Sequence, residues 1–460
     1  MKLELVKSEG IAHHSYFLSD GYEAVVIDPR RDCLVYKDLA NKDCTKIKYI
    51  LETHRNEDYV IGSLELQSVT GARICHSNEL GFKYGDPALN DGETFSVGSL
   101  KIEALYTPGH TNESLCYVVY QENSNVASFV FSGDTLFAGS VGRTDLFGKN
   151  SQEGQAKKLY QSIHEKLLPL GDQAIIYPGH GSGSLCGHNI SDQDYSTIGY
   201  ERRTNPCLLL DENAFVDHSV NEELLLPPYF RRMEEVNLNG PPLLGQREIP
   251  PALGLSDFEQ ELKQANTILV DTREPYAFSG SFVPGSINIW FEGTSVYPGW
   301  MLNYDQRLLF VNERREDMGA VALRLWRIGF DNMIGYLCNG IREWQDNGKP
   351  VDSIGTMSAS SLKTELDAGK LLVLDVREPS EWKEGYIKGA ERIYVGYLND
   401  KADALSKDES IAVICSVGNR ASIAASLLKK KSFNHVHNVL GGMTAWENLS
   451  YPTEKASPAS

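Results

Sequence analysis

The second half of the chain carries one sequence pattern twice, and this repeat restricts its fold more than any other feature. Asp271-Thr-Arg-Glu-Pro recurs as Asp375-Val-Arg-Glu-Pro, 104 positions later. Gly340-Ile-Arg-Glu-Trp recurs as Gly442-Met-Thr-Ala-Trp, 102 positions later, as small loop deletions would produce. Each copy alternates strand and helix patterns, which is typical of a parallel sheet with helices on both faces. We therefore predict two copies of one doubly wound, parallel-sheet α/β domain.

The first half has a different pattern, rich in short strands. Apolar or alternating runs such as Ala24-Val-Val-Ile-Asp and Leu100-Lys-Ile-Glu-Ala-Leu predict strands, while helical stretches are fewer and the clearest is 153–168. Proline pairs mark a linker near 238–252. A chain of 460 residues is too long for one core. We predict three domains, which span 1–240, 253–350 and 353–452.

Composition and charge narrow the environment and the partners. The net charge of −18 argues against nucleic acid, which selects basic surfaces. No segment approaches the roughly 20 apolar residues that span a bilayer, and the charged N-terminus Met1-Lys-Leu-Glu-Leu-Val-Lys is not a signal peptide. Eight scattered cysteines without a C-x-x-C pair fit a reducing compartment. We expect a cytoplasmic protein with neither a nucleic-acid nor a membrane partner.

One cysteine stands apart from the other seven. Cys415-Ser-Val-Gly-Asn-Arg lies between the apolar strand Ile411-Ala-Val-Ile and a helix that begins near Arg420. Backbone N–H groups, the positive end of the helix and the guanidinium all favour a thiolate there. The same nest of donors can hold a persulfide or an oxyanion such as thiosulfate. We predict Cys415 and Arg420 as catalytic, and substrate contacts at Ser416, Gly418 and Asn419.

This loop, with Asp375-Val-Arg-Glu-Pro-Ser-Glu-Trp before it and Leu440-Gly-Gly-Met-Thr-Ala-Trp after it, resembles a rhodanese (sulfurtransferase) domain. The resemblance implies that Cys415 carries sulfur as a persulfide and that Arg420 helps to hold an anionic sulfur donor. It also implies structural roles for Asp375 and Arg377. The first copy departs from the pattern at the decisive point.

In the first copy, aligning Leu308-Leu-Phe-Val with the strand before Cys415 places Asn312 at the cysteine position. The loop that follows, Glu-Arg-Arg-Glu-Asp, has no glycine. Asparagine cannot carry sulfane sulfur, and Cys338 aligns with Leu440 rather than with the cysteine. Residues 253–350 are therefore predicted to be a catalytically silent, rhodanese-like domain.

Four polar groups in the first domain follow predicted strands. Thr53-His-Arg-Asn-Glu-Asp-Tyr59 resembles the two-metal motif T-H-x-H-x-D-H, with Asn56 and Tyr59 in place of two histidines. Three further turns place a glycine directly before a histidine or an aspartate at the end of a strand. These turns present His110, Asp134 and His180.

Together these pieces resemble the metallo-β-lactamase fold, an αββα sandwich, in its glyoxalase II and persulfide dioxygenase branch. The loss of two imidazoles argues against a pair of zinc ions. The resemblance implies one Fe(II) per chain, with Zn as the alternative, held by His54, His110 and Asp134. Two imidazoles and one carboxylate with open positions suit non-haem Fe(II) and O2. Around these ligands we predict a second shell of Asp58, His180, Asn56 and Tyr59, and a substrate contact from Arg143.

The leading hypothesis is an enzyme that oxidises a low-molecular-weight thiol persulfide with O2 to sulfite and transfers sulfane sulfur through Cys415, with thiosulfate as product or donor. One alternative is a sulfurtransferase whose first domain is inactive. Another is a Zn-dependent thioester hydrolase of the glyoxalase II type. The family resemblance further implies a homo-oligomer.

Overall fold

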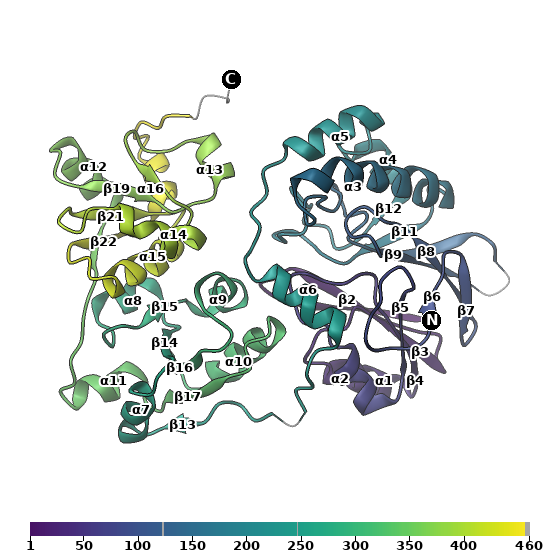
Figure 1. Ribbon diagram of the computed structural model, residues 1–460, viewed down its shortest axis with the longest axis horizontal. Helices are drawn as coiled ribbons and strands as arrows, with labels where there is room; N and C mark the ends of the chain where they lie inside the picture. Colours follow the sequence, from purple (N-terminus) through teal and green to yellow (C-terminus); the bar gives the residue numbers. More distant parts are fainter. Residues whose placement is uncertain (122–123, 246, 456–460) are drawn as a thin grey trace. The chain divides into compact units, whose positions relative to one another are not determined.

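The computed structural model describes residues 1–121, 124–245 and 247–455, and the chain divides into two compact units. One unit consists mainly of Met1–Arg247 and the other mainly of residues 248–460. No helix in the described part of the chain is long and apolar enough to cross a membrane. Each unit contains both helices and strands (Figure 1), and each has its own hydrophobic core.

The first unit is built on two six-stranded sheets packed face to face. The first sheet has the order β1-β2-β3-β4-β5-β6, and the second has the order β12-β11-β10-β9-β8-β7. Both are mixed. In the first sheet β1 pairs antiparallel with β2 and β3 pairs in parallel with β4, and in the second β8 pairs antiparallel with β9 and β10 pairs in parallel with β11. The strands are β1 (Lys2–Ser8), β2 (His13–Ser19), β3 (Glu23–Ile27), β4 (Lys46–Leu51), β5 (Arg73–Ser77), β6 (Ala88–Leu89), β7 (Glu93–Val97), β8 (Leu100–Tyr106), β9 (Leu115–Tyr120), β10 (Ala127–Gly133), β11 (Ile175–Pro178) and β12 (Ser196–Thr197).

Side-chain alternation along these strands produces the layers. In β2, Leu18 faces the core between the sheets, while Phe17 packs under the helices on the other face. In β9, Tyr117 and Val119 face the core between the sheets, and Val118 packs beneath the outer helices. Figure 1 shows α1 and α2 on one sheet and α3, α4 and α5 on the other. The predicted αββα sandwich is confirmed.

The helices of the first unit are short. The helix predicted at 153–168 begins earlier, after Gly148, and continues through a π turn. The helical elements are α1 (Leu34–Asp43), α2 (Ser63–Thr70), α3 (Lys149–Gln161), η1 (Ser162–Leu167), η2 (Leu168–Leu170), α4 (Ile198–Thr204), α5 (Glu212–Asn221) and α6 (Phe230–Asn239).

The second unit contains two five-stranded parallel sheets with the same strand order. The first runs β13-β17-β16-β14-β15 and the second runs β18-β22-β21-β19-β20. This identity of topology confirms the fold predicted from the repeat. The strands are β13 (Ala252–Leu253), β14 (Thr267–Asp271), β15 (Ile287–Asn288), β16 (Arg307–Val311), β17 (Met333–Leu337), β18 (Gly355–Met357), β19 (Leu372–Asp375), β20 (Glu391–Arg392), β21 (Ile411–Ile414) and β22 (Val436–Val439).

The repeated residues make the same contacts in both copies. Arg273 pairs with Asp271 at 2.7 Å (Nη2 to Oδ2), and Arg377 pairs with Asp375 at the same distance. Each arginine also donates to a backbone carbonyl eight residues on. All four side chains are buried, so these pairs fix the turn after the strand.

The helices of the second unit are α7 (Leu255–Leu262), α8 (Pro275–Gly280), η3 (Phe291–Ser295), α9 (Tyr297–Met301), α10 (Asp317–Arg327), α11 (Gly340–Asp346), α12 (Ala359–Asp367), α13 (Pro379–Glu384), η4 (Val395–Tyr397), α14 (Leu398–Lys401), η5 (Ala402–Ala404), α15 (Asn419–Lys430) and α16 (Gly442–Asn448).

Candidate functional site

The loop between β4 and α2 is buried and held from both sides. Thr53 donates from its backbone N–H and its hydroxyl to the carboxylate of Asp28, at 2.8 and 2.7 Å. Further along the loop, the amide of Asn237 in α6 donates to the backbone carbonyls of Asn56 and Tyr59, at 2.7 and 2.8 Å. These bonds satisfy loop groups that have no strand partner, so the loop presents its side chains in fixed directions.

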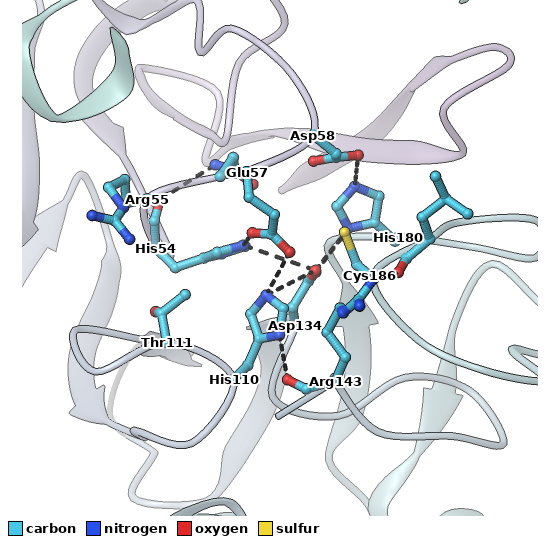
Figure 2. Close-up of polar contacts among 12 residues, drawn as sticks. His54, Arg55, Glu57, Asp58, His110, Thr111, Asp134, Arg143, His180 and Cys186 are labelled. Atoms are coloured by element: carbon cyan, nitrogen blue, oxygen red, sulfur yellow. Dashed lines mark hydrogen bonds and ion pairs between the residues drawn. The ribbon is translucent and has the colours of Figure 1, made fainter. Parts of the chain in front are cut away.

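Three strand ends bring His54, His110 and Asp134 together at the edge of the sandwich. The Nε2 atoms of His54 and His110 lie 3.8 and 3.6 Å from Asp134 Oδ2. The two rings are nearly perpendicular, with centroids 5.1 Å apart. All three side chains are buried and point toward one another (Figure 2). The structure therefore places the three predicted ligands around one point.

Hydrogen bonds to the outer ring nitrogens determine which nitrogen of each histidine is free. The Thr53 hydroxyl already donates to Asp28, so it accepts from His54 Nδ1, which lies 2.8 Å away. His110 Nδ1 lies 2.9 Å from the backbone carbonyl of Arg143, which can only accept. Both Nε2 atoms are thus left to face the convergence point, and neither has a hydrogen-bond partner in the described chain. This is the arrangement of metal-ligating histidines, so these residues fit a metal ion.

Charge at the site also suits a cation. Burial lowers the pKa of His54 to about 4, so its imidazole is uncharged near neutral pH. Burial acts in the opposite direction on Asp134, but His180, His54 and His110 bring its pKa below the ordinary value. A neutral imidazole and an ionised carboxylate are the forms that bind metals.

A fourth residue, Glu57, enters the same space, although its sequence position did not predict this role. Its carboxylate oxygens lie 3.2 Å from His110 Nε2 and 3.8 Å from His54 Nε2, and the side chain is fully buried. Burial alone would lower the pKa of His110, but the charges of Glu57 and Asp134 raise it to about 9 when no metal ion is bound, so His110 must release a proton from Nε2 to bind a metal. The sequence signal was an acidic residue at a spacer position of the loop motif, next to Asp58.

On the other side of Asp134, the ring of His180 is already engaged, whereas Asp58 Oδ1 and the Tyr59 hydroxyl have no hydrogen-bond partner among the described residues. His180 is hydrogen-bonded through both ring nitrogens, with Nδ1 2.9 Å from Asp134 Oδ1 and Nε2 3.0 Å from Asp58 Oδ2. The ring of Tyr59 packs against that of His13, with centroids 4.0 Å apart and the planes tilted by 32°. The Asn56 side chain turns back to the carbonyl of its own loop at residue 54. Because both ring nitrogens of His180 are hydrogen-bonded, whereas His54 and His110 each direct Nε2 at the convergence point, the arrangement favours one metal position over two.

The Cys415 loop lies between β21 and α15, as expected from the apolar strand before it. The thiol is buried, and the N–H of Gly418 donates to Sγ at 3.1 Å. Three N–H groups at the start of α16 donate to the carbonyls of residues 415, 416 and 417, at 2.8 to 3.0 Å. The loop is therefore fixed by backbone bonds on the side opposite α15.

Arg420 is positioned by a carboxylate that was not predicted. Glu381 of α13 accepts from both terminal nitrogens of Arg420, at 2.5 and 2.8 Å, and from the hydroxyl of Ser416, at 2.7 Å. Glu381 belongs to the sequence motif Asp375-Val-Arg-Glu-Pro-Ser-Glu-Trp, but only the fold shows where its side chain points. In the first copy, Asn312 directly follows β16, as Cys415 follows β21, and its side-chain oxygen accepts from Thr272.

Comparison with known proteins agrees with this fold. Residues 9–180 match the family model of the metallo-beta-lactamase superfamily, and residues 255–347 and 358–449 match that of the rhodanese-like domain. The protein "Persulfide dioxygenase ETHE1, mitochondrial" of Homo sapiens is 32% identical over 220 residues, which are 46% of this chain and 78% of the relative. The chain belongs to the metallo-beta-lactamase superfamily. It carries two rhodanese-like domains as well.

Two other similarities accompany this match. A probable hydroxyacylglutathione hydrolase of Schizosaccharomyces pombe is 29% identical over 222 residues, 43% of this chain and 81% of the relative. The crystal structure of a metallo-beta-lactamase from Staphylococcus aureus aligns with a TM-score of 0.66 and 30% identity, over 73% of this chain and 98% of that one. This structural alignment is longer than the family-model match of residues 9–180, so it also covers residues outside that range.

Arg143 in the metallo-beta-lactamase domain lies close to the metal ligands but is engaged by the fold. Its guanidinium forms two bonds to Asp145, at 2.6 and 2.7 Å, and donates to the carbonyls of Leu185 and Leu225, at 2.9 Å each. Its own carbonyl holds His110. These bonds make Arg143 a positioning residue, and its contact with substrate stays a prediction.

Proposed function

We propose that this chain is an enzyme of sulfur metabolism that oxidises a low-molecular-weight thiol persulfide to sulfite and transfers sulfane sulfur through Cys415. The observation that carries the proposal is the convergence of the Nε2 atoms of His54 and His110 and the Asp134 carboxylate at one buried point. The relation to persulfide dioxygenases and the rhodanese-like domains support the same class of substrate.

For the first step, we propose that His54, His110 and Asp134 hold one Fe(II) ion. When bound, iron supplies the activation of O2 that persulfide oxidation requires. The overall reaction consumes one persulfide, one O2 and one water, and it releases one thiol, one sulfite and two protons. The chain fixes the tautomers of both ligating histidines through Thr53 and the Arg143 carbonyl.

For the second step, we propose that the Cys415 thiolate attacks the outer sulfur of a persulfide, and the thiol leaves as its anion. Sulfite then attacks the outer sulfur of the Cys415 persulfide, which releases thiosulfate and restores the thiolate. The Gly418 N–H donates to the sulfur, and Arg420, held by Glu381, places a positive charge beside the loop for the anionic donor. The first rhodanese-like domain, with Asn312 in place of the cysteine, takes no part in the transfer.

Separate variants test the two steps in the full chain. After anaerobic loading with Fe(II), the wild-type protein is expected to consume O2 when a thiol persulfide is added. His110→Ala should lose this uptake and retain transfer from thiosulfate to cyanide, whereas Cys415→Ser should lose the transfer and retain the uptake.

The two activities that are measured, O2 uptake and sulfur transfer, also distinguish the alternative functions. Absence of O2 uptake by the iron-loaded wild type, with transfer intact, would leave a sulfurtransferase with an inactive first domain. Hydrolysis of a glutathione thioester by the zinc-loaded protein would support the hydrolase, although the bonded state of His180 argues against a second metal position.

A further inference from the structure

The carboxylate of Glu57 is buried among the candidate metal ligands, and the group nearest to it is one of them, His110, whose Nε2 lies 3.2 Å from Oε1. The side chain is 0% exposed, and neither of its oxygens has a hydrogen-bond partner in the described residues. An ionised carboxylate without donors is costly in a protein interior, so a cation must compensate it. The polar atoms nearest to its oxygens are the Nε2 atoms of His110 and His54, and both histidines belong to the proposed metal site.

The measured separations among the four side chains, 3.2 to 3.8 Å, are slightly longer than those of donors that share one ion. First-row metals bind nitrogen and oxygen at about 2.0 to 2.2 Å, so neighbouring ligand atoms lie about 3 to 3.5 Å apart. Glu57 Oε1 lies 3.2 Å from His110 Nε2, and Asp134 Oδ2 lies 3.6 Å from the same atom. His54 Nε2 is 3.8 Å from both Glu57 Oε2 and Asp134 Oδ2. Small movements bring all four atoms to one centre.

The local sequence explains why Glu57 reaches this point. Asn56 turns its amide back to the backbone, and the carbonyls of Asn56 and Tyr59 are fixed by Asn237. Between them, Glu57 points toward the histidines, while Asp58 points the other way to His180 (Figure 2). The loop thus lacks an imidazole at position 56 but supplies a carboxylate from the next residue.

We propose that Glu57 is a direct ligand of the metal, in addition to His54, His110 and Asp134. The inference rests on the metal site of the proposed function. Two carboxylates bring the ligand charge to −2, which balances a divalent cation in a buried site. They make the site richer in hard oxygen donors than two imidazoles and one carboxylate, which favours Fe(II), Mn(II) or Co(II) over softer ions.

The test measures Co(II) binding by the full-length protein after removal of metals with a chelator. Co(II) reports its coordination in the visible spectrum, and competition with a chromophoric chelator gives the affinity. Loss of a residue outside the ligand shell typically weakens metal binding roughly 10- to 100-fold. Glu57→Gln, which keeps the shape and removes the charge, is expected to weaken Co(II) binding by more than this and to change the spectrum.

The matched control is Glu201→Gln, which also removes a fully buried carboxylate from the same unit. Glu201 accepts from Gly139, Ser196 and Asn205, away from the histidines, so this variant is expected to bind Co(II) as the wild type does. Thermal unfolding of both variants shows whether they are folded. If Glu57→Gln does not fold, a crystal structure of the Co(II)-loaded wild type decides, with a Glu57 oxygen expected at bonding distance from the ion.

The outcomes separate this inference from the proposed function. Equal affinity and an unchanged spectrum in Glu57→Gln, or a Co(II) ion that Glu57 does not contact, would overturn the inference and leave the three-residue site in place. Failure of the wild type to bind Co(II) or Fe(II) would overturn both, and would show that Glu57 serves only as an ion-pair partner of His110.

Discussion

Gly442→Ala is expected to abolish sulfur transfer by displacing the Cys415 loop. Gly442 begins α16 with a positive φ of 52°, and a Cβ there would lie 2.1 Å from the carbonyl oxygen of Cys415 and 2.5 Å from that of Ser416. Ordinary contact begins near 3.4 Å, so the loop must move by about 3.4 − 2.1 = 1.3 Å. A displacement of about 1 Å costs roughly 100-fold in rate when it misplaces a reacting group.

A second glycine separates this clash from backbone strain. Gly369 has a similar φ of 65°, but a Cβ there meets nothing within 4 Å. Alanine in the left-handed region costs about 1 to 2 kcal/mol at either position. Gly369→Ala should therefore lose only the stability that backbone strain costs, and it should keep the sulfur-transfer activity.

The assay follows thiocyanate formation from thiosulfate and cyanide, and thermal unfolding reports stability. Gly442→Ala should lose kcat/KM by roughly 100-fold or more, while Gly369→Ala should match the wild type. If Gly442→Ala turned over as fast as Gly369→Ala, the close packing of α16 against the Cys415 loop would have no role in sulfur transfer.

Three further substitutions test other parts of the account. Thr53→Val removes the acceptor of His54 Nδ1–H and should weaken metal binding roughly 10- to 100-fold in chelator competition, whereas unchanged affinity would contradict the orienting role. Burial raises the pKa of Glu52 from 4.5 to about 8, so the folded state holds the Glu52 proton more tightly than the unfolded state does. The free energy of unfolding should therefore fall as pH rises between these two values, by at most about 1.4 kcal/mol per pH unit. Glu52→Gln should flatten this pH dependence in thermal unfolding, and an unchanged slope would refute the reasoning. Asn312→Cys in a Cys415→Ser background should form no thiocyanate, because its loop has no glycine cradle, and measurable transfer would show that the first rhodanese-like domain is not silent.

The sequence predicted the fold well where a pattern reports burial or a turn. The repeat predicted two parallel-sheet domains, because the same apolar strands and the same Asp–Arg turn must pack in the same way twice. The glycine before His110, Asp134 and His180 placed each polar group at a strand end, and the structure brings these groups to one edge of the sandwich.

What the sequence could not show is the direction of side chains within a loop. Glu57 and Asp58 are adjacent acidic residues, yet Glu57 reaches His110 and Asp58 reaches His180. Their directions are set by Asn237, a residue 180 positions further along the chain than Glu57. The bonding of His180 on both ring nitrogens likewise depends on carboxylates from two separate strand ends.

The measurement that tests the central claim most directly is anomalous diffraction from crystals of the protein loaded anaerobically with Fe(II). The account predicts one iron peak per chain, within bonding distance of His54 Nε2, His110 Nε2 and Asp134, and none between Asp58 and His180. Two peaks about 3.5 to 4 Å apart would indicate a dinuclear hydrolase centre instead. The absence of any peak at the convergence of His54, His110 and Asp134 would contradict the proposal of a metal-dependent first step.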